Sequence, residues 1–212
     1  MSSKKLLIDL QYLPPLEYFC LMSRYEEIHL EAHEHFVKQT YRNRCYILGP
    51  NKSVRLIVPV YDRSKKVLSG EVRIDHSQKW AGNHWRSLES SYGKSAFFIH
   101  YSEMFEEIIR SKTENLFELN FKLLTLCLHL LGWKKKLVPT RAYEKSPKNN
   151  EYDDFRDYIT PKDSHCERQI YTPKKYFQLF GKTFAENLSI IDLLFSEGTH
   201  SGKVLDDSTR LY

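Results

Sequence analysis

The densest group of side chains able to do chemistry lies between Glu31 and Arg44, in the run EAHEHFVKQTYRNR. Lys38, Arg42 and Arg44 can each donate hydrogen bonds to a phosphate or a carboxylate, and an arginine can do so through two parallel bonds. The carboxylates Glu31 and Glu34 would give such a pocket mixed charge, which suits a zwitterionic or polyhydroxylated ligand. We therefore expect this segment to bind an anionic or zwitterionic small molecule. The alternative is a solvated loop between two strands.

A second candidate is His84, which falls at steps of four residues with Trp80 and Tyr92 on one predicted helical stripe. A histidine on such a stripe is more often a core residue than a catalyst. If it borders a pocket, its pKa near neutrality suits a general acid or base. In that arrangement Glu31 is the alternative proton carrier, and Tyr41 or Trp80 would stack on a ring of the ligand.

Two groupings of metal-binding residue types do not amount to a recognisable metal site. Three histidines alternate with Glu31 on one predicted strand face, namely His29, His33 and His35. Imidazole and carboxylate can bind zinc, but polar residues on the wet face of a strand need no metal, and no motif supplies a fourth ligand. The pair His165-Cys166 is adjacent, which is poor spacing for a Cys-His dyad because the base must approach the sulfur from elsewhere in the fold. We predict no metal site, and the residues identify no cofactor.

The elements that must position these residues alternate between strand-like and helix-like periods. Strands are predicted over 5–10, 28–32 and 71–75, and apolar runs at 45–48 and 54–60 flank a Gly-Pro turn, which is typical of a hairpin. Helices are predicted over 16–25, 80–92, 95–111, 115–131, 176–184 and 188–195. The fold class is α/β, with a central mixed sheet from the N-terminal half and packed helices from the C-terminal half.

One domain is expected over residues 1–198, with a polar loop or lobe at 144–170 and a polar, frayed tail at 199–212. The 8 glycines of the 212 residues are never adjacent or separated by a single residue, so G-x-G-x-x-G cannot occur. The P-loop and the G-x-S-x-G elbow are also absent, which excludes three common classes of enzyme. Any anionic ligand should therefore be held by side chains.

Charge and apolar patterning limit the partners and the location. The net charge of +5 is spread over interleaved acidic and basic residues, which argues against a nucleic-acid binder. The most apolar stretch, 116–133, contains charged residues and is not expected to cross a membrane. Four scattered cysteines and a short apolar run near the N-terminus indicate a reducing, cytoplasmic location. The oligomeric state, including a homo-oligomer, is left open.

Several motifs resemble those of the WbqC-like protein family, in the same order, between residues 5 and 198. They are YLPPLEYF at 12–19, KQTYRNR at 38–44, Trp80 with HWRS at 84–87, FRDYITPK at 155–162, YFQ at 176–178 and NLSIIDLLF at 187–195. Within that family the chain is most similar to the branch found in Bacteroides-like bacteria.

The resemblance implies a bacterial cytoplasmic protein, since some members of the family are encoded in O-antigen clusters. It suggests a transferase that places an aminoacyl, acyl or related group on a nucleotide sugar or another sugar-bearing substrate during surface-polysaccharide biosynthesis. Donor and acceptor are not identified. The candidate catalytic residues are Glu31 and His84. The candidate substrate-binding residues are Tyr12, Glu34, Lys38, Gln39, Tyr41, Arg42, Asn43, Arg44, Trp80, Arg156 and Lys162.

The alternative function is a non-catalytic binding or assembly protein that uses the same polar patch to dock a partner protein. The chain contains 3 Trp, 14 Tyr and 12 Phe, and aromatic residues are enriched at protein interfaces. A deep pocket lined by the polar candidates would favour the enzyme, whereas a flat aromatic patch would favour the binding protein.

Overall fold

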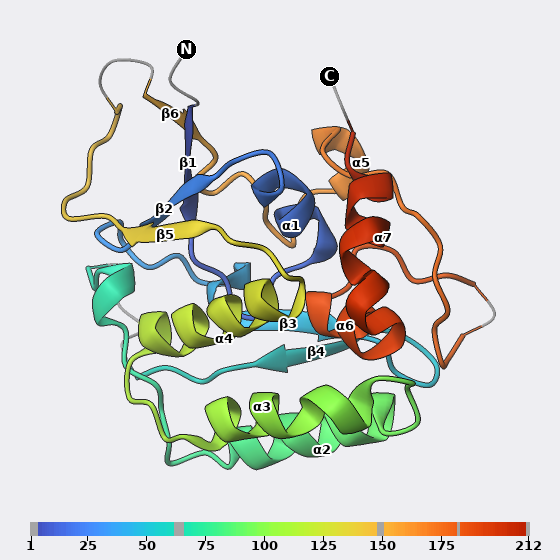
Figure 1. The fold of residues 1–212 in the computed structure, drawn as a ribbon. Coiled ribbons are helices and arrows are strands. Elements are labelled where there is room, and N and C mark those ends of the chain that lie inside the picture. The colour runs from blue at the N-terminus through green and yellow to red at the C-terminus, as the bar shows by residue number, and fades with distance from the viewer. Residues whose placement is uncertain (1–3, 62–65, 148–150, 182, 211–212) are drawn as a thin grey trace.

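The centre of the fold is a four-stranded parallel sheet in the order β5-β2-β1-β6 (Figure 1). The structure is a computed structural model that describes residues 4–61, 66–147, 151–181 and 183–210. The sheet is built from β1 (Lys5–Asp9), β2 (Glu27–Glu31), β5 (Lys136–Pro139) and β6 (Tyr152–Asp154). All three pairings in this sheet are parallel, so each strand ends at the same edge.

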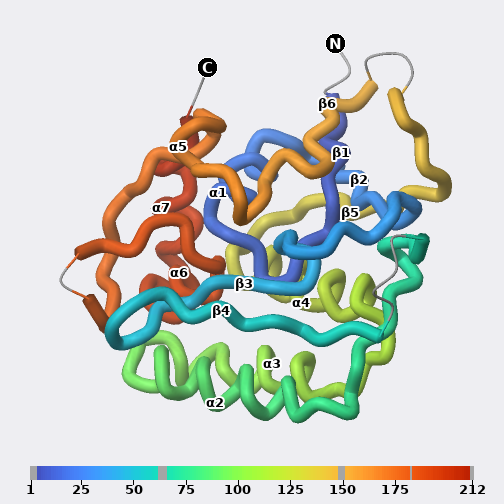
Figure 2. Tube along the Cα trace, turned by 180° about the vertical axis from the view of Figure 1, so that it is seen from behind, coloured from blue at the N-terminus to red at the C-terminus, as the bar shows by residue number. Residues whose placement is uncertain are grey.

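The crossover from β1 to β2 is the helix α1 (Leu16–Met22), and all of its residues are buried. It starts directly after Pro14 and Pro15, and proline is well tolerated at the beginning of a helix. The helix α7 (Ser201–Ser208) lies beside α1 on its outer side (Figures 1 and 2). Tight packing of α1 against the sheet fixes the loop that leaves the carboxyl end of β1.

A separate antiparallel hairpin, β3 (Arg44–Ile47) and β4 (Val54–Ile57), lies between the parallel sheet and a pair of helices (Figures 1 and 2). These helices are α2 (Trp80–Tyr92) and α3 (Phe98–Arg110). The helix α4 (Leu116–Leu130) follows, and Asn115 begins it by accepting a hydrogen bond from the backbone N–H of Glu118.

The C-terminal helices close the core against this layer. The helix α6 (Ile190–Glu197) carries Phe195, whose ring centroid lies 5.5 Å from that of Tyr92, 5.0 Å from that of Phe98 and 5.6 Å from that of Phe105. The other elements among the described residues are the short helix α5 (His165–Arg168) and 3-10 turns at Tyr41–Asn43, Ser69–Glu71 and Gly198–His200. Aromatic packing thus joins α2, α3 and α6.

The α/β class and the packing of helices from the C-terminal half are confirmed, whereas the composition of the sheet differs from the expectation. The central sheet is parallel rather than mixed, and β5 and β6 come from the C-terminal half. Antiparallel pairing of consecutive strands is confined to the hairpin, whose prediction is confirmed. The predicted 144–170 lobe contributes β6 to the sheet and also contains α5.

Three local predictions are wrong. Residues 71–75 bury Val72 and Ile74 but form only isolated bridges, because their neighbours are loops rather than strands. Of the predicted helix 176–184, the described residues 176–181 and 183–184 form no helix, and the side chain of Gln178 bonds instead to the backbone of Ala185. The expected fraying is absent from residues 198–210, where α7 buries Leu205; residues 211–212 lie outside the described chain.

Candidate functional site

Polar side chains gather at the carboxyl ends of the parallel strands. Asp9 ends β1, Glu31 ends β2, Asp154 ends β6, and Thr140 directly follows β5. In open α/β sheets, ligands bind outside the carboxyl ends of the strands, where the strand order reverses. The chain runs outward from β1 through β2 to β5 and then returns to the other side of β1 with β6. The edge near β1 and β6 is therefore the expected place for a ligand.

A cleft of about 370 Å³ lies over one face of the sheet and reaches this edge at Glu31 and Arg156. This volume lies within the range typical of small-molecule sites, about 300–1,000 Å³. Its walls come from all four strands and the loop after β5. The lining residues are Leu7, His29, Glu31, Val138, Pro139, Thr140, Arg141, Ala142, Glu144, Pro147, Tyr152 and Arg156.

The floor of the cleft carries a buried carboxylate, Glu31, which is only 1% exposed. Its Oε1 accepts hydrogen bonds from the backbone N–H of His33 and the hydroxyl of Thr140, both at 2.8 Å. Its Oε2 accepts one from Nη1 of Arg156 at 2.9 Å. Both oxygens of Glu31 are thus occupied by hydrogen-bond donors of the protein.

Arg156 is the cation that joins the cleft floor to β6. Its Nε and Nη2 donate to the two carboxylate oxygens of Asp154 at 2.9 and 2.6 Å, and its guanidinium lies 4.9 Å from the ring centroid of Tyr143. The hydrogen bonds to Asp154 are the main cause that raises the pKa of Arg156. The guanidinium is therefore charged and fixed in orientation.

A second arginine of the cleft, Arg141, is exposed and makes no hydrogen bond or ion pair with another described residue. On β2, Nε2 of His29 lies 2.7 Å from the carboxylate of Glu27, and the ring of His29 packs edge-on against Tyr152 at 4.8 Å between centroids. The cleft thus combines a bound guanidinium, an available guanidinium and an aromatic wall. Such a set can hold an anion next to a ring.

A buried ionic cluster adjoins the cleft around Arg42, which is 2% exposed. Its Nε donates to Glu34 at 2.8 Å, its Nη2 donates to Asp157 at 2.9 Å, and its Nη1 lies 3.6 Å from Asp9. One guanidinium therefore faces three carboxylates. Burial, together with the negative charges of Asp9 and Asp157, raises the pKa of Glu34 to about 7 although Arg42 opposes the shift.

A small cavity of about 10 Å³ is lined by Arg42 of this ionic cluster and by Glu31, which also lines the cleft. A volume of about 10–15 Å³ is what one water molecule needs. Asn120 also lines the cavity, and its amide donates to the backbone carbonyl of Arg42. The cleft and the ionic cluster are thus neighbours that share Glu31.

The structure brings four of the sequence candidates together in this region, namely Glu31, Glu34, Arg42 and Arg156. The other polar candidates lie elsewhere. Lys38, Gln39 and Lys162 are exposed on loops, and Arg44 is half-buried at the start of β3. The amide of Asn43 donates to the carbonyl of Val58, and Tyr41 lines a different cavity.

His84 is placed in the core with Tyr12 and Trp80 and does not line the cleft. The hydroxyl of Tyr12 lies 3.0 Å from Nδ1, and Nε2 lies 3.1 Å from the carbonyl oxygen of Ile57. A neutral ring that donates from Nε2 and accepts at Nδ1 satisfies both contacts. Burial lowers the pKa of His84 to about 4, so it stays neutral at physiological pH.

Sequence reasoning did not select Asp9, Thr140, Arg141, Tyr152 or Asp157 for this region. Asp9 could have been found, because it directly follows the apolar run of a predicted strand, where parallel sheets place ligand contacts. The others depend on β5 and β6, which hold only four and three residues. Such short strands give no readable alternation.

The fold and this region define an α/β protein with a polar cleft at the carboxyl edge of a parallel sheet. Residues 11–160, more than half of the chain, match the WbqC-like protein family. The chain belongs to this family. It is also 25% identical over 223 residues to the uncharacterized protein Rv1507c of Mycobacterium tuberculosis, in an alignment that covers 93% of this chain and 95% of the relative. No solved structure matches the chain.

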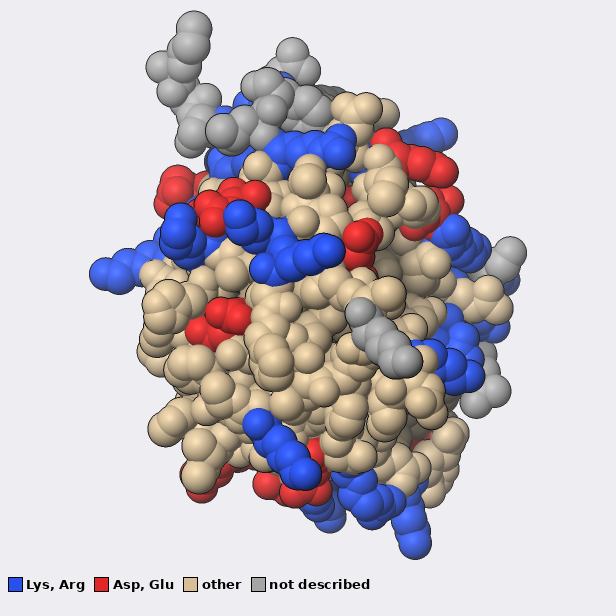
Figure 3. All heavy atoms as spheres, turned by 90° about the vertical axis from the view of Figure 1, so that its right-hand side faces the viewer, with Lys and Arg blue, Asp and Glu red and all other residues tan. Residues whose placement is uncertain are grey.

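The surface and helices bear on the expected partners. No helix in the described part of the chain is long and apolar enough to cross a membrane. Figure 3 shows the face at the right of Figure 1, where Lys and Arg side chains alternate with Asp and Glu along the upper part and a broad central area is uncharged. On this face the basic residues form no continuous stripe, although the exclusion of nucleic acid stays a prediction.

Proposed function

We propose that this protein is a cytoplasmic transferase of bacterial surface-polysaccharide biosynthesis, which binds an anionic sugar-bearing substrate in the cleft at the sheet edge. The observation that carries the proposal is the pairing of a buried, oriented Glu31–Arg156 ion pair with the available guanidinium of Arg141 around one cavity. Membership of the WbqC-like family supports the biological setting, because the family is associated with polysaccharide-related genes.

In this proposal the cleft recognises the substrate through side chains alone. Arg141 binds the phosphate or carboxylate, since its guanidinium can donate two parallel hydrogen bonds to either group, and Arg156 adds its positive charge and the second N–H of Nη1. The ring of Tyr152 packs against the sugar or the base. Thr140 lines the cleft beside Glu31, and Asp154 lies beside Arg156. The oxygens of these two side chains are the proposed acceptors of hydrogen bonds from sugar hydroxyls. A nucleotide sugar combines all of these chemical groups.

The transferred group is an aminoacyl, acyl or related group. An amine or hydroxyl of the acceptor forms a bond to the acyl carbon and loses a proton, while the bond from that carbon to the donor's carrier breaks and the carrier leaves with the electron pair. Glu34, whose pKa of about 7 would suit proton transfer near neutral pH, lines neither the cleft nor the small cavity, so the proposal gives it no contact with the substrate. Glu31 is held by three donors, so its part is to orient Arg156. His84 has no part in this proposal, because both of its ring nitrogens are engaged in the core.

The second candidate, a non-catalytic binding protein, is favoured by one observation. Both oxygens of Glu31 and all three side-chain nitrogens of Arg156 are already bonded within the protein. Such a cleft can hold a ligand without offering a free base to it. Binding and turnover therefore need separate measurements.

Binding is tested by isothermal titration calorimetry with a panel of nucleotide sugars, on the wild type and on Arg141→Ala. Arg141 is exposed and makes no described contact, so its removal leaves the fold unchanged. We expect binding by the wild type and at least about tenfold weaker binding by Arg141→Ala, the loss of about one charge-assisted hydrogen bond. The matched control is Arg55→Ala, which removes an exposed arginine of β4 outside the cleft.

The proposal fails if no member of the panel binds, or if Arg141→Ala binds as tightly as the wild type. Turnover is measured on any sugar that binds, by mass spectrometry after incubation with aminoacyl and acyl donors. Specific binding without any new product would favour the binding protein over the transferase.

A further inference from the structure

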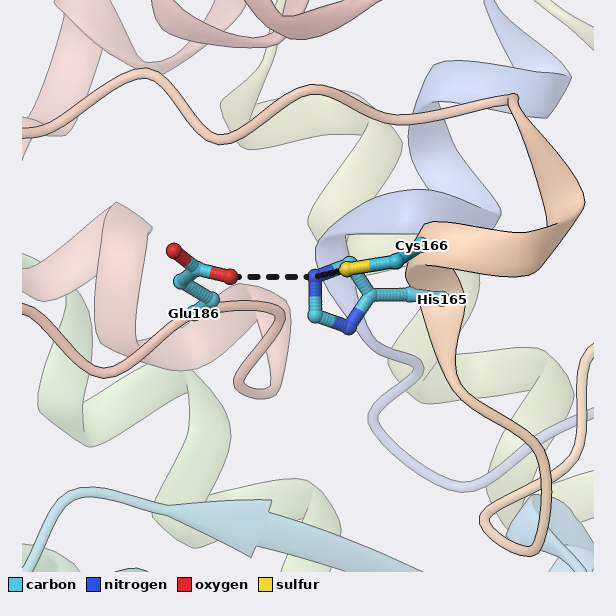
Figure 4. Close-up of side chains that lie close together, drawn as sticks. All are labelled: His165, Cys166 and Glu186. Carbon is cyan, nitrogen blue, oxygen red and sulfur yellow. Dashed lines mark hydrogen bonds and ion pairs between the residues drawn. The ribbon is translucent and has the colours of Figure 1, made fainter.

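Three donor side chains converge at a point outside the cleft, as Figure 4 shows. His165 and Cys166 come from the start of α5, and Glu186 comes from the segment before α6. Nε2 of His165 lies 3.6 Å from Sγ of Cys166 and 3.2 Å from a carboxylate oxygen of Glu186. All three donor atoms lie within 4.8 Å of one another. The sequence alone gave no role to His165 and Cys166, because the third donor is 20 residues further along the chain.

The nitrogen Nε2 of His165 faces two neighbours, the thiol of Cys166 and the carboxylate of Glu186, and carries at most one proton. If Nε2 carries a proton, it donates to Glu186 and cannot also accept the thiol proton of Cys166. If Nε2 is unprotonated, its lone pair accepts from the thiol and faces the negative carboxylate at 3.2 Å. A cation bound between the three atoms satisfies both contacts of Nε2 at once, since the nitrogen, the sulfur and the oxygen then each give a lone pair to the same centre.

The distances agree with the coordination geometry of zinc. Zinc binds sulfur at about 2.3 Å, imidazole nitrogen at about 2.0–2.1 Å and carboxylate oxygen at about 2.0–2.2 Å, usually as a tetrahedron. A tetrahedral centre therefore separates N from S by about 3.6 Å and N from O by about 3.4 Å. The observed separations are 3.6 and 3.2 Å. The remaining sulfur–oxygen pair can close by rotation of the Glu186 side chain, which is 46% exposed.

The backbone on both sides holds these donors in place. The hydroxyl of Ser164 accepts from the N–H of Cys166 and begins α5, and the ring of His165 packs edge-on against Tyr171. Next to Glu186, the amide of Asn187 accepts from the backbone N–H of Glu17 in α1. Both segments are thus anchored to the core, and the donor side chains extend from fixed backbone.

We propose that His165, Cys166 and Glu186 bind one zinc ion, with the fourth position open to solvent. Thiolate, imidazole and carboxylate together are a donor set that suits zinc better than magnesium or calcium. A cavity of about 290 Å³ adjoins the site and is lined by His165, Glu186 and Tyr41 among others. Three protein ligands with an open fourth position are the arrangement that lets zinc hold a water or a small ligand. This site does not depend on the function proposed for the cleft.

The test is zinc affinity of the metal-stripped protein, measured by competition with a chromophoric chelator under reducing conditions. We expect one zinc per chain in the wild type and affinity at least about tenfold weaker in both Cys166→Ser and Glu186→Gln, because each loses a ligand. Cys166 is the exposed cysteine of the chain, and Cys20, Cys45 and Cys127 are buried. The matched control is Glu167→Gln, an exposed carboxylate of the same helix that is not among the three donors.

Cobalt substitution gives a second readout, which reports directly whether a thiolate is bound to the metal. Bound Co²⁺ should show a thiolate-to-cobalt charge-transfer absorption band in the wild type and in Glu167→Gln, and no such band in Cys166→Ser. Circular dichroism checks that every variant is folded. The proposal is overturned if the wild type takes up no stoichiometric zinc, or if Cys166→Ser binds zinc with wild-type affinity.

Discussion

Lowering the pH from 7 to 5 should act on His84 and Glu34 in opposite directions. Burial lowers the pKa of His84 from 6.5 to about 4. Between these two pH values the unfolded chain binds a proton at His84 and the folded protein does not. The stability that neutral His84 contributes is therefore lost as the pH falls. The pKa of Glu34 is raised from 4.5 to about 7, so its contribution is complete below pH 4.5 and is lost as the pH rises through 7.

The two effects are similar in size. One pKa unit corresponds to about 1.4 kcal/mol, so moving from pH 7 to pH 5 costs about 2 kcal/mol through His84. The same change returns about 2 kcal/mol through Glu34. The free energy of unfolding of the wild type should hence depend little on pH through this pair. Each single variant should show the pH dependence of the group that remains.

The variants His84→Gln and Glu34→Gln test this reasoning. Glutamine at position 84 can still donate to the carbonyl of Ile57 and accept from Tyr12, but it does not titrate. The free energy of unfolding is measured by urea denaturation with tryptophan fluorescence at pH 5, 6 and 7. On going from pH 7 to pH 5, and relative to the wild type, His84→Gln should gain about 2 kcal/mol and Glu34→Gln should lose about 2 kcal/mol. If both variants keep the wild-type pH dependence, the burial argument is refuted.

Three further substitutions are tested by chemical denaturation. Arg168→Ala should cost about 3–5 kcal/mol, because it leaves the carboxylate of Glu17, 0% exposed, without the guanidinium that donates to both of its oxygens at 2.8 and 2.7 Å. A cost below 1 kcal/mol would mean that this pair is not buried as described. Gly198→Ala should also destabilise, since φ is +54° and the new Cβ would lie 2.2 Å from the ring of Phe97. At Gly82 in α2, the new Cβ would make only an ordinary van der Waals contact, 3.8 Å from Nη1 of Arg86, so Gly82→Ala should instead stabilise by about 0.5–1 kcal/mol; equal effects at the two glycines would contradict this account.

Long periodic segments could be predicted from the sequence. The helix α2 repeats Trp80, His84, Leu88 and Tyr92 at four-residue steps, and all four are buried on one face. The hairpin β3–β4 is local, since its two strands flank one turn. Such elements carry their own signal, because neighbouring residues decide the structure.

Elements that depend on distant partners could not be predicted. The strand β6 is the triplet Tyr152–Asp154, and its two aspartates lower the strand propensity of an already short run. It is a strand because β1 pairs with it in parallel. The segment 176–184 looked helical, but Gln178 and Tyr176 instead bond to the buried carboxylate of Asp192.

The candidate site was predicted in part for the same reason. Glu31, Glu34 and Arg42 were selected because they are close in sequence, and the structure brings them to one edge. Arg156 was selected through the resemblance rather than through its spacing. Its partner Glu31 lies 125 residues earlier, and only the parallel register reveals that contact.

The pairing of β1 with β6 also sets the order in which the molecule can be assembled. Lys5 and Glu151 form an ion pair across 146 residues of chain. At a synthesis rate of about 5–20 residues per second, roughly 10–30 s pass between the synthesis of β1 and the synthesis of β6. Throughout that interval Glu31 has no guanidinium from Arg156. The cleft is therefore a late product of translation, and a growing chain cannot bind ligand there until the last strand of the sheet has been made.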